Sequence, residues 1–196
     1  TNRFDNTTIT GNITINNGTI NVTDKAIKLS NKNSISKITI NDGNIHGTTS
    51  AITGEYGTIE VNGGNISSDD GTTLYTKYNP ITINDGTITS TNETTIRTPN
   101  NLTVYNGTIT GKTAISNGDT VYFSDITVTI NGGHIIGTEE NGIDILGSST
   151  TNKIVINGGI IEGNLSGVHT TQKIIIGNDN NNISIDSPVL IGHTDY

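Results

Sequence analysis

Apolar positions along the chain follow one short pattern that recurs. An aliphatic, a polar and a second aliphatic residue are followed by Asn, a Gly-containing turn and one further aliphatic residue, as in ITINNGTINV (13–22), ITINDGTITS (81–90) and VTINGGHIIG (128–137). Successive copies begin 20 to 26 residues apart, at Ile13, Ile38, Ile59, Ile81, Leu102, Val128, Ile154 and a degenerate eighth position, Ile174. A repeat of this length is typical of solenoid proteins.

Each copy predicts three short strands. The first carries two aliphatic residues on one face, such as Ile81 and Ile83, because strand side chains alternate with a period of two. The second and third carry one inward aliphatic residue each, such as Ile88 and Ile96. A single copy cannot bury these side chains, but stacked copies can. The sequence therefore predicts an all-β fold, a right-handed parallel β-helix (solenoid) of about eight coils with ~22 residues per coil.

An Asn directly follows the first strand in most copies. Asn tolerates the left-handed backbone of a tight turn, and stacked Asn amides can form hydrogen bonds from coil to coil. We therefore predict a structural Asn ladder, formed by Asn16, Asn41, Asn62, Asn84, Asn131 and Asn157. Tyr105 takes this place in the fifth copy, where we expect a distorted corner.

The repeats run along the whole chain, which predicts one parallel β-helix domain over residues 1–196. Neither end has a recognisable cap, so we expect a fragment of a longer repetitive protein that continues in further repeats or domains. Three intervals are longer than the others because residues are inserted after the third strand, at 30–37, 116–126 and 146–153. All three insertions are expected along the same edge, and such an edge is commonly a binding side.

The composition excludes several classes of function. A formal net charge of -8 argues against binding to nucleic acid, which requires clustered Lys and Arg. Insertion into a membrane is not expected, because no apolar run is long enough to cross a bilayer. The absence of Cys removes disulfides and thiolate chemistry.

Motifs for metal-dependent hydrolysis, acyl transfer, phosphate binding and redox chemistry are absent, which favours a protein that is not an enzyme. The acidic pairs Asp69-Asp70 and Glu139-Glu140 lie at predicted corners, where neighbouring side chains rarely point the same way. The first-strand column that would carry catalytic carboxylates in a β-helix enzyme holds Thr at most positions instead. No catalytic residue is predicted.

The outward column of the third strand is the most varied, and it supplies the ligand-binding candidates. Stacking is expected to place Tyr75 beside Arg97, an arrangement that can hold a sugar or its carboxylate, or can be a cation–π pair on a solvated surface. The other candidates are Tyr122 and Phe123, an aromatic pair in the middle insertion that forms either a flap packed on the rod or a ligand platform. The column reads Lys28, Thr53, Tyr75, Arg97, Ser116, Asp144 and His169.

No cofactor is predicted, but calcium remains a candidate ligand. The stretch DNNNISID, from Asp179 to Asp186, offers oxygen donors at alternating positions without matching an EF-hand loop. The histidines are not at metal-ligand spacing and are interpreted as surface residues.

The repeated phrase ITINGGxI followed by Ala-Ile or Gly-Ile, with the closing run IIIGNDNNNISIDSPVLIGHTDY (174–196), resembles repeats of large secreted or wall-attached proteins of low-GC Gram-positive bacteria. The chain is also similar to β-helical carbohydrate-binding proteins of clostridia. The resemblance implies an extracellular or cell wall-attached location and a polysaccharide or host-surface glycan as partner. It transfers no functional residue, because no site motif matches.

Three functions remain after the sequence is considered. The first is a non-enzymatic surface rod of the adhesin type, which binds polysaccharide or acts as a stalk. The second is a polysaccharide lyase or hydrolase built on a β-helix, which requires several acids and a base on adjacent coils. The third is a segment of a phage tail fibre or spike, in which Tyr122 and Phe123 would be buried at a threefold axis.

Overall fold

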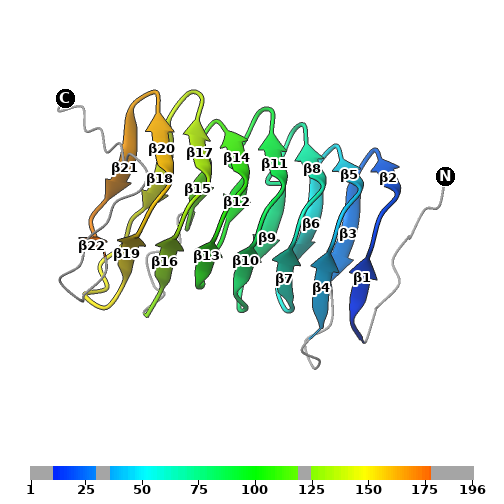
Figure 1. Cartoon of the computed structure of the whole chain (residues 1–196), viewed down its shortest axis with the longest axis horizontal. Helices are drawn as coiled ribbons and strands as arrows, with labels where there is room; N and C mark the ends of the chain where they lie inside the picture. Colours follow the sequence, from blue (N-terminus) through cyan, green and yellow to red (C-terminus); the bar gives the residue numbers. More distant parts are fainter. Residues whose placement is uncertain (1–10, 30–35, 119–124, 178–196) are drawn as a thin grey trace.

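The fold is a β-solenoid of stacked parallel coils (Figure 1). The computed structural model describes residues 11–29, 36–118 and 125–177, and every regular element within them is a β-strand. The strands form three parallel sheets of eight, seven and seven strands, called sheets A, B and C below. The described strands thus complete seven coils and begin an eighth, close to the eight predicted, and the predicted fold class is confirmed.

Each coil contributes its first strand to sheet A, its second to sheet B and its third to sheet C. Sheet A contains β1 (Ile13–Ile15), β4 (Lys37–Ile40), β7 (Thr58–Val61), β10 (Ile81–Ile83), β13 (Leu102–Val104), β16 (Thr127–Ile130), β19 (Lys153–Ile156) and β22 (Lys173–Ile176). Sheet B contains β2 (Thr19–Val22), β5 (Asn44–Gly47), β8 (Asn65–Ser68), β11 (Thr87–Ser90), β14 (Thr108–Gly111), β17 (His134–Gly137) and β20 (Ile160–Gly163). Sheet C contains β3 (Lys25–Leu29), β6 (Ser50–Gly54), β9 (Leu74–Thr76), β12 (Ile96–Arg97), β15 (Ile115–Ser116), β18 (Asn141–Ile145) and β21 (Ser166–Thr170).

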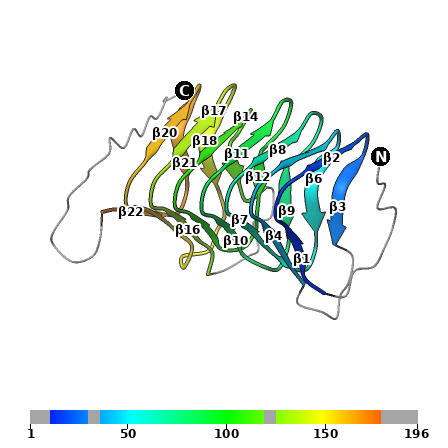
Figure 2. The same ribbon diagram turned by 45° about the vertical axis from the view of Figure 1, so that its right-hand side comes forward.

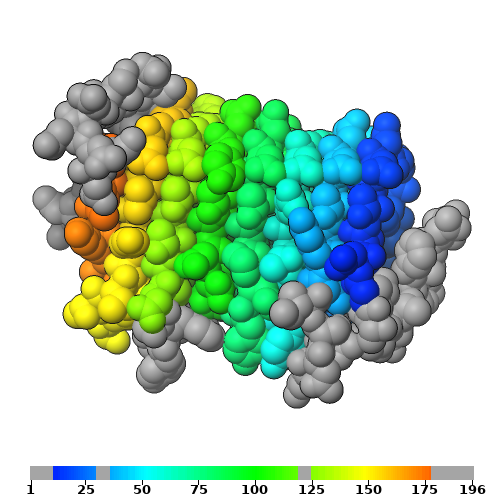
Figure 3. Space-filling model, turned by 60° about the horizontal axis from the view of Figure 1, so that its bottom comes forward, coloured from blue at the N-terminus to red at the C-terminus, as the bar shows by residue number. Residues whose placement is uncertain are grey.

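The register of the sheets follows the sequence repeat. Ile81 pairs with Ile59 of the preceding coil and with Leu102 of the following one, so the pattern's starting residues stack directly on one another. The last of the predicted starting positions, Ile174, pairs with Ile154. The coils therefore lie side by side in sequence order, as the bands of colour in Figure 3 show.

The core consists of aliphatic side chains in continuous columns inside the coils. Ile81, Ile83, Ile88 and Ile96 of the fourth coil are fully buried, while Thr82 between the first two is partly exposed. Each such Ile contributes roughly 1.5–3 kcal/mol when buried. Burial is incomplete at the last described strand, where Ile174 is 36% and Ile176 is 43% exposed.

Buried hydroxyl groups line the corner between sheets B and C, and they find backbone partners. The hydroxyl groups of Thr73 and Thr95 donate to the carbonyl oxygens of Thr89 (2.8 Å) and Thr110 (2.6 Å), respectively. Because a buried hydroxyl without a partner costs free energy, these bonds explain how Thr replaces the small apolar residue found there in other coils.

The corner between sheets A and B holds the Asn side chains in a hydrogen-bonded ladder. The amide nitrogens of Asn41, Asn62 and Asn84 each donate to the amide oxygen of the Asn one coil earlier, at 2.8, 2.8 and 2.6 Å. Asn157 donates to Asn131 at 2.8 Å. Gly follows two residues after each of these Asn residues, at a corner with little room between coils. At Gly64, φ is +88°, and a Cβ atom would lie only 2.6 Å from the carbonyl oxygen of Gly43.

Tyr105 interrupts this ladder without disturbing the backbone. Its N–H donates to the carbonyl oxygen of Ile83 at 2.8 Å, and the next coil donates from Asn131 N to Val104 O at 2.7 Å. The prediction of a distorted corner is therefore wrong for the main chain, because the backbone hydrogen bonds between coils do not depend on the side chain. What is lost is the amide link between Asn84 and Asn131, and the Tyr105 side chain is 54% exposed.

The three insertions all leave the solenoid between a strand of sheet C and the next strand of sheet A, after β3, β15 and β18. Figure 2 shows the successive coils as open loops. Of the three, only the insertion between β18 and β19 lies wholly within the described residues. The described part of the chain contains no helix of the length and apolarity required to span a membrane.

Replacing one inward side chain at mid-solenoid tests the core. Ile88→Ala should lower the free energy of unfolding by about 2–5 kcal/mol, since it removes buried methyl groups and leaves a cavity. The matched control is the outward neighbour, Thr89→Ala, for which we expect a change of about 0.5 kcal/mol or less. Urea unfolding followed by circular dichroism measures both; equal losses would contradict the inward and outward assignment.

Restoring the ladder at Tyr105 tests whether the amide column stabilises the fold. Tyr105→Asn should raise the free energy of unfolding by about 1 kcal/mol, because the new amide can donate to Asn84 and accept from Asn131. The control, Tyr105→Asp, introduces a side chain of nearly the same shape as Asn but without an amide donor, so it should raise the free energy of unfolding by less. A Tyr105→Asn variant no more stable than Tyr105→Asp would show that the ladder adds nothing at this corner.

Candidate functional site

The outward face of sheet C carries the side chains that the sequence singles out for ligand binding. Lys28 pairs with Thr53, Thr53 with Tyr75, and Tyr75 with Arg97, so the four side chains form one column along the solenoid axis. Each step is one strand, or ~4.8 Å. The structure therefore brings Tyr75 and Arg97 together as neighbours.

Two open hollows meet at this column and together form one groove, called the sheet C groove below. The larger hollow, of about 310 Å³, lies over β3, β6 and the residues that follow β6, and it is lined mainly by apolar atoms. The smaller, of about 200 Å³, extends to Arg97 and is lined by the hydroxyl-bearing residues Thr49 and Thr72. Both hollows share Lys25, Thr53 and Tyr75, so Tyr75 lies at the centre of the groove.

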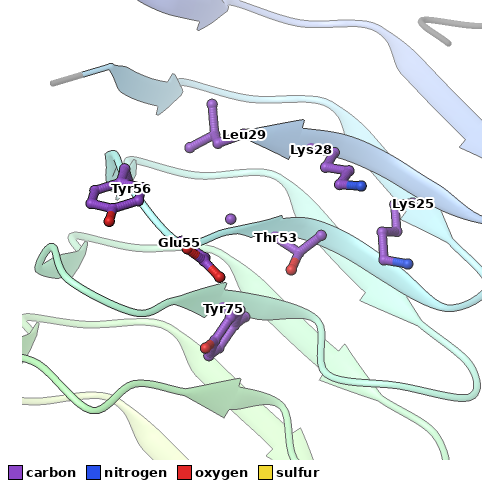
Figure 4. A pocket seen from close by; sticks show the side chains of 8 residues that line it. Lys25, Lys28, Leu29, Thr53, Glu55, Tyr56 and Tyr75 are labelled. Carbon is purple, nitrogen blue, oxygen red and sulfur yellow. The ribbon is translucent and has the colours of Figure 1, made fainter. Parts of the chain in front are cut away.

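Gly54 and Leu29 both line the larger hollow, and they lie in close contact there. Gly54 pairs with Leu29, and a Cβ atom on Gly54 would lie 2.5 Å from the Cβ atom of Leu29. In Figure 4, Tyr56 lies on one side of this hollow, Lys25 and Lys28 lie on the other, and Glu55 lies between Tyr56 and Tyr75.

Tyrosine is concentrated at this end of the sheet. The chain has six Tyr residues, and Tyr56, Tyr75 and Tyr78 all belong to the second and third coils. The rings of Tyr56 and Tyr78 contact each other with centroids 4.8 Å apart and an angle of 33° between their planes. The ammonium group of Lys77 lies 5.0 Å from the centre of the Tyr78 ring, and a side-chain hydrogen bond with Tyr78 is the largest cause of the raised pKa of Lys77. The Tyr56 ring therefore packs against the Tyr78 ring, and Tyr56 also lines the larger hollow.

The groove has more positive charge than the protein as a whole. Lys25, Lys28 and Arg97 line it, and Glu55 is the one carboxylate among its described lining residues. Lys25 lies 3.6 Å from the carboxylate of Asp24, whereas Lys28 and Arg97 form no ion pair with any described residue. Within the part of the chain that the structure describes, these two cations at the groove thus have no carboxylate within ion-pair distance.

Arg97 is held in place by the turn after β15. A Cβ atom on Gly118 would lie 2.2 Å from Nε of Arg97, so the guanidinium group lies directly against the Gly118 backbone. The φ angle of Gly118 is +64°, and its N–H donates to the hydroxyl oxygen of Ser116 at 2.8 Å. This contact limits the conformational freedom that the Arg97 side chain would lose when a ligand binds.

The remaining part of the column differs in charge. Beyond Ser116 it continues through Asp144 and His169, whose carboxylate oxygen and Nδ1 are 2.9 Å apart. The cationic and aromatic residues therefore occupy the first four coils, and the acidic end begins two strands after Arg97.

The other candidate residues divide into two groups. Tyr122, Phe123, Asp179 and Asp186 lie outside the described residues, so their predicted roles in ligand and calcium binding stay predictions. Among the described residues, no group of three or more His, Asp or Glu side chains gathers where a metal ion could bind.

Sequence reasoning missed Lys25, Leu29 and Tyr56 as groove residues. Lys25 begins the third strand of its coil, three residues before Lys28, and strict alternation along a strand would place the two on opposite faces, so the spacing does not predict that both line the groove. Tyr56 lies in the corner after β6, where the repeat does not fix the direction of a side chain. Only the Tyr residues recurring at this corner, Tyr56 and Tyr78, signal an aromatic cluster.

One polar trio on sheet B has the composition of a hydrolase triad. Nδ1 of His46 lies 3.0 Å from the hydroxyl oxygen of Ser67, and its Nε2 lies 3.3 Å from the Asp69 carboxylate. The adjacent backbone N–H groups of Asp69 and Asp70 already donate to the carbonyl oxygen of Thr48. They are therefore not free to stabilise an oxyanion, which acyl transfer requires.

The acidic pairs at the corners point toward different neighbours, as expected. Asp69 approaches His46, whereas Asp70 accepts a hydrogen bond from Asn92 of the following coil at 3.1 Å. Glu139 pairs with Lys112 at 3.3 Å, and Glu140 accepts a bond from the Thr113 hydroxyl at 2.5 Å. Neither pair forms the two facing carboxylates that glycoside hydrolysis uses.

Removing a hydroxyl at the groove tests its electrostatics. Thr49 donates to Asp24 at 2.6 Å, and this bond is the largest cause of the lowered pKa of Asp24; Lys25 adds to it. Thr49→Val should raise this pKa, since the ionised form loses its donor. Because the folded-state pKa is depressed, the small stability contribution of Asp24 is present above its unfolded pKa and is lost as pH falls through the folded value. Titration of Asp24 by NMR measures the shift; an unchanged pKa would show that Thr49 does not stabilise the ionised form.

In comparisons with known proteins, no family model, no curated protein and no solved structure matches this chain. The geometry of the sheet C groove therefore carries the functional inference.

Proposed function

We propose that this protein is a non-enzymatic, extracellular or cell wall-attached β-solenoid of the adhesin type, which binds polysaccharide in the sheet C groove. The observation that carries the proposal is the position of Tyr75 at the centre of a groove that has a second ring, Tyr56, beside it. Sugar rings present C–H faces that pack on aromatic rings, and they carry hydroxyl groups that need hydrogen-bond partners. The groove supplies both, since Thr49, Thr53 and Thr72 line it.

The form of the groove also supports binding to a chain molecule. It is open rather than enclosed, and its two hollows follow one another across four coils. A small metabolite is usually buried in a concave pocket, whereas an open groove leaves both ends free for a polymer to continue.

The groove offers little for hydrolysis. Cleavage of a glycosidic bond uses two carboxyl groups on either side of the bond. The described lining of the groove has one, Glu55. This supports a binding role over the alternative of a lyase or hydrolase, and the experiment below includes an assay for cleavage.

A glycan array is the direct test, run with and without calcium on the wild-type chain and on Tyr75→Ala. We expect binding to at least one polysaccharide, and a loss of about 10-fold or more in affinity when the ring is removed. Tyr75 is partly exposed and points outward, so the variant should remain folded, which circular dichroism checks. The control is Tyr105→Ala, which removes a more exposed ring on a different edge and should bind like the wild type.

The outcomes separate the alternatives. If no glycan is retained either with or without calcium, the binding role is overturned and the role of a stalk remains. Equal binding by Tyr75→Ala would place the site elsewhere. Shortened or unsaturated products after incubation with the retained polysaccharide would show an enzyme.

A further inference from the structure

We infer that the ligand of the sheet C groove is an acidic polysaccharide whose chain runs along the solenoid axis and whose anionic groups contact Lys28 and Arg97. This inference rests on the proposed glycan-binding function and adds the chemical class and the direction of the ligand. The class is a glycan bearing carboxylate, sulfate or phosphate groups.

The first support is the charge of the groove against that of the protein. The chain has 18 acidic and 10 basic residues, yet three of the basic residues line this one groove with a single carboxylate among them. A neutral sugar chain would not need cations. Lys28 and Arg97 have no ion-pair partner among the described residues, unlike Lys37, which pairs with Glu60, and Lys112, which pairs with Glu139.

The second support is the arrangement of the two cations. They lie at the two ends of the column Lys28, Thr53, Tyr75, Arg97, with three strand steps between them, a span of about 14 Å. Tyr75 lies between them, one step from Arg97. A chain that stacks on Tyr75 and reaches both cations must therefore run across the strands, parallel to the solenoid axis.

The third support is the nature of the two cationic groups. Arg97 lies against Gly118, which restricts its side chain, and a planar guanidinium group can make bidentate contact with a carboxylate or sulfate. Lys28 is exposed and can follow an anion that varies in position. This combination of one fixed and one mobile cation suits a polymer with repeated anionic groups.

The experiment measures affinity by calorimetry for matched pairs of polymers. Polygalacturonate is compared with its fully methyl-esterified form, and dextran sulfate with dextran, so that carboxylate and sulfate are tested separately against neutral chains. We expect at least one acidic polymer to bind about 10-fold more tightly than its neutral counterpart. The difference should shrink as NaCl rises from about 0.05 M to about 0.5 M, because exposed charges are screened.

Charge-removing variants locate the contact. Lys28→Gln and Arg97→Gln should each weaken binding of the acidic polymer by about 3- to 10-fold and leave any binding of the neutral polymer unchanged. The matched control is Lys153→Gln, which removes the same charge from sheet A and should have no effect. An equal loss in all three variants would mean a general effect of net charge and would overturn the site.

Chain length tests the direction. A digalacturonate is too short to span the distance between Lys28 and Arg97. Its affinity should therefore fall strongly in Lys28→Gln or in Arg97→Gln, but not in both, whereas the affinity of a longer oligomer should fall in both variants. If the effects of the two variants do not depend on length, the ligand does not run along the axis.

The remaining outcomes distinguish this inference from the function on which it rests. Tighter binding of the neutral polymers would preserve the glycan-binding role and overturn the acidic class. Binding of poly-L-glutamate as tight as that of the acidic glycans would show a site for any polyanion and overturn both.

Discussion

The requirement that each coil lie in register on the next determines most of this structure. A coil of three short strands has no interior of its own, so its aliphatic side chains are buried only when equivalent side chains cover them from above and below. Ile81 lies between Ile59 and Leu102 for this reason. The same requirement acts at the corners, where the coils approach so closely that Gly64 has no room for a Cβ atom. Residues that break the repeat are therefore confined to the outside and to the inserted loops.

A consequence is that the outer surface is organised in columns as well. Whatever stands at one outward position has the equivalent residue of the neighbouring coil ~4.8 Å away. Lys28, Thr53, Tyr75 and Arg97 lie in one column in this way although they are separated in sequence by 69 positions from first to last. In a globular protein such residues would be gathered by loops. Here the core repeat positions them, and they are free to vary because none of them contributes to the core.

The regularity also explains what the sequence could and could not predict. The inward aliphatic residues and the adjacency of Tyr75 and Arg97 follow from the period alone, and the structure agrees with both. The corner at Tyr105 was expected to distort, but its backbone bonds are made by groups that every residue carries. The hollow lined by Gly54 and Tyr56 does not follow from the repeat, because Tyr56 lies in the corner after β6, where the period does not fix the direction of a side chain. Departures from the repeat at corners need coordinates.

Charge is distributed along the axis in a way that the core does not require. Sheet C carries cations and tyrosines over its first four coils, and Lys28 and Arg97 among them pair with no described carboxylate, whereas Asp144 and His169 contact each other farther along. The solenoid can place a Lys beside a carboxylate of the next coil, as Lys37 is beside Glu60, although an exposed pair of this kind adds at most about 1 kcal/mol. Lys28 and Arg97 lack such partners among the described residues, although the chain has more acids than bases. In a protein of net charge -8, cations beside an aromatic groove with no described carboxylate partner support the proposed acidic ligand, which would supply negative charge there.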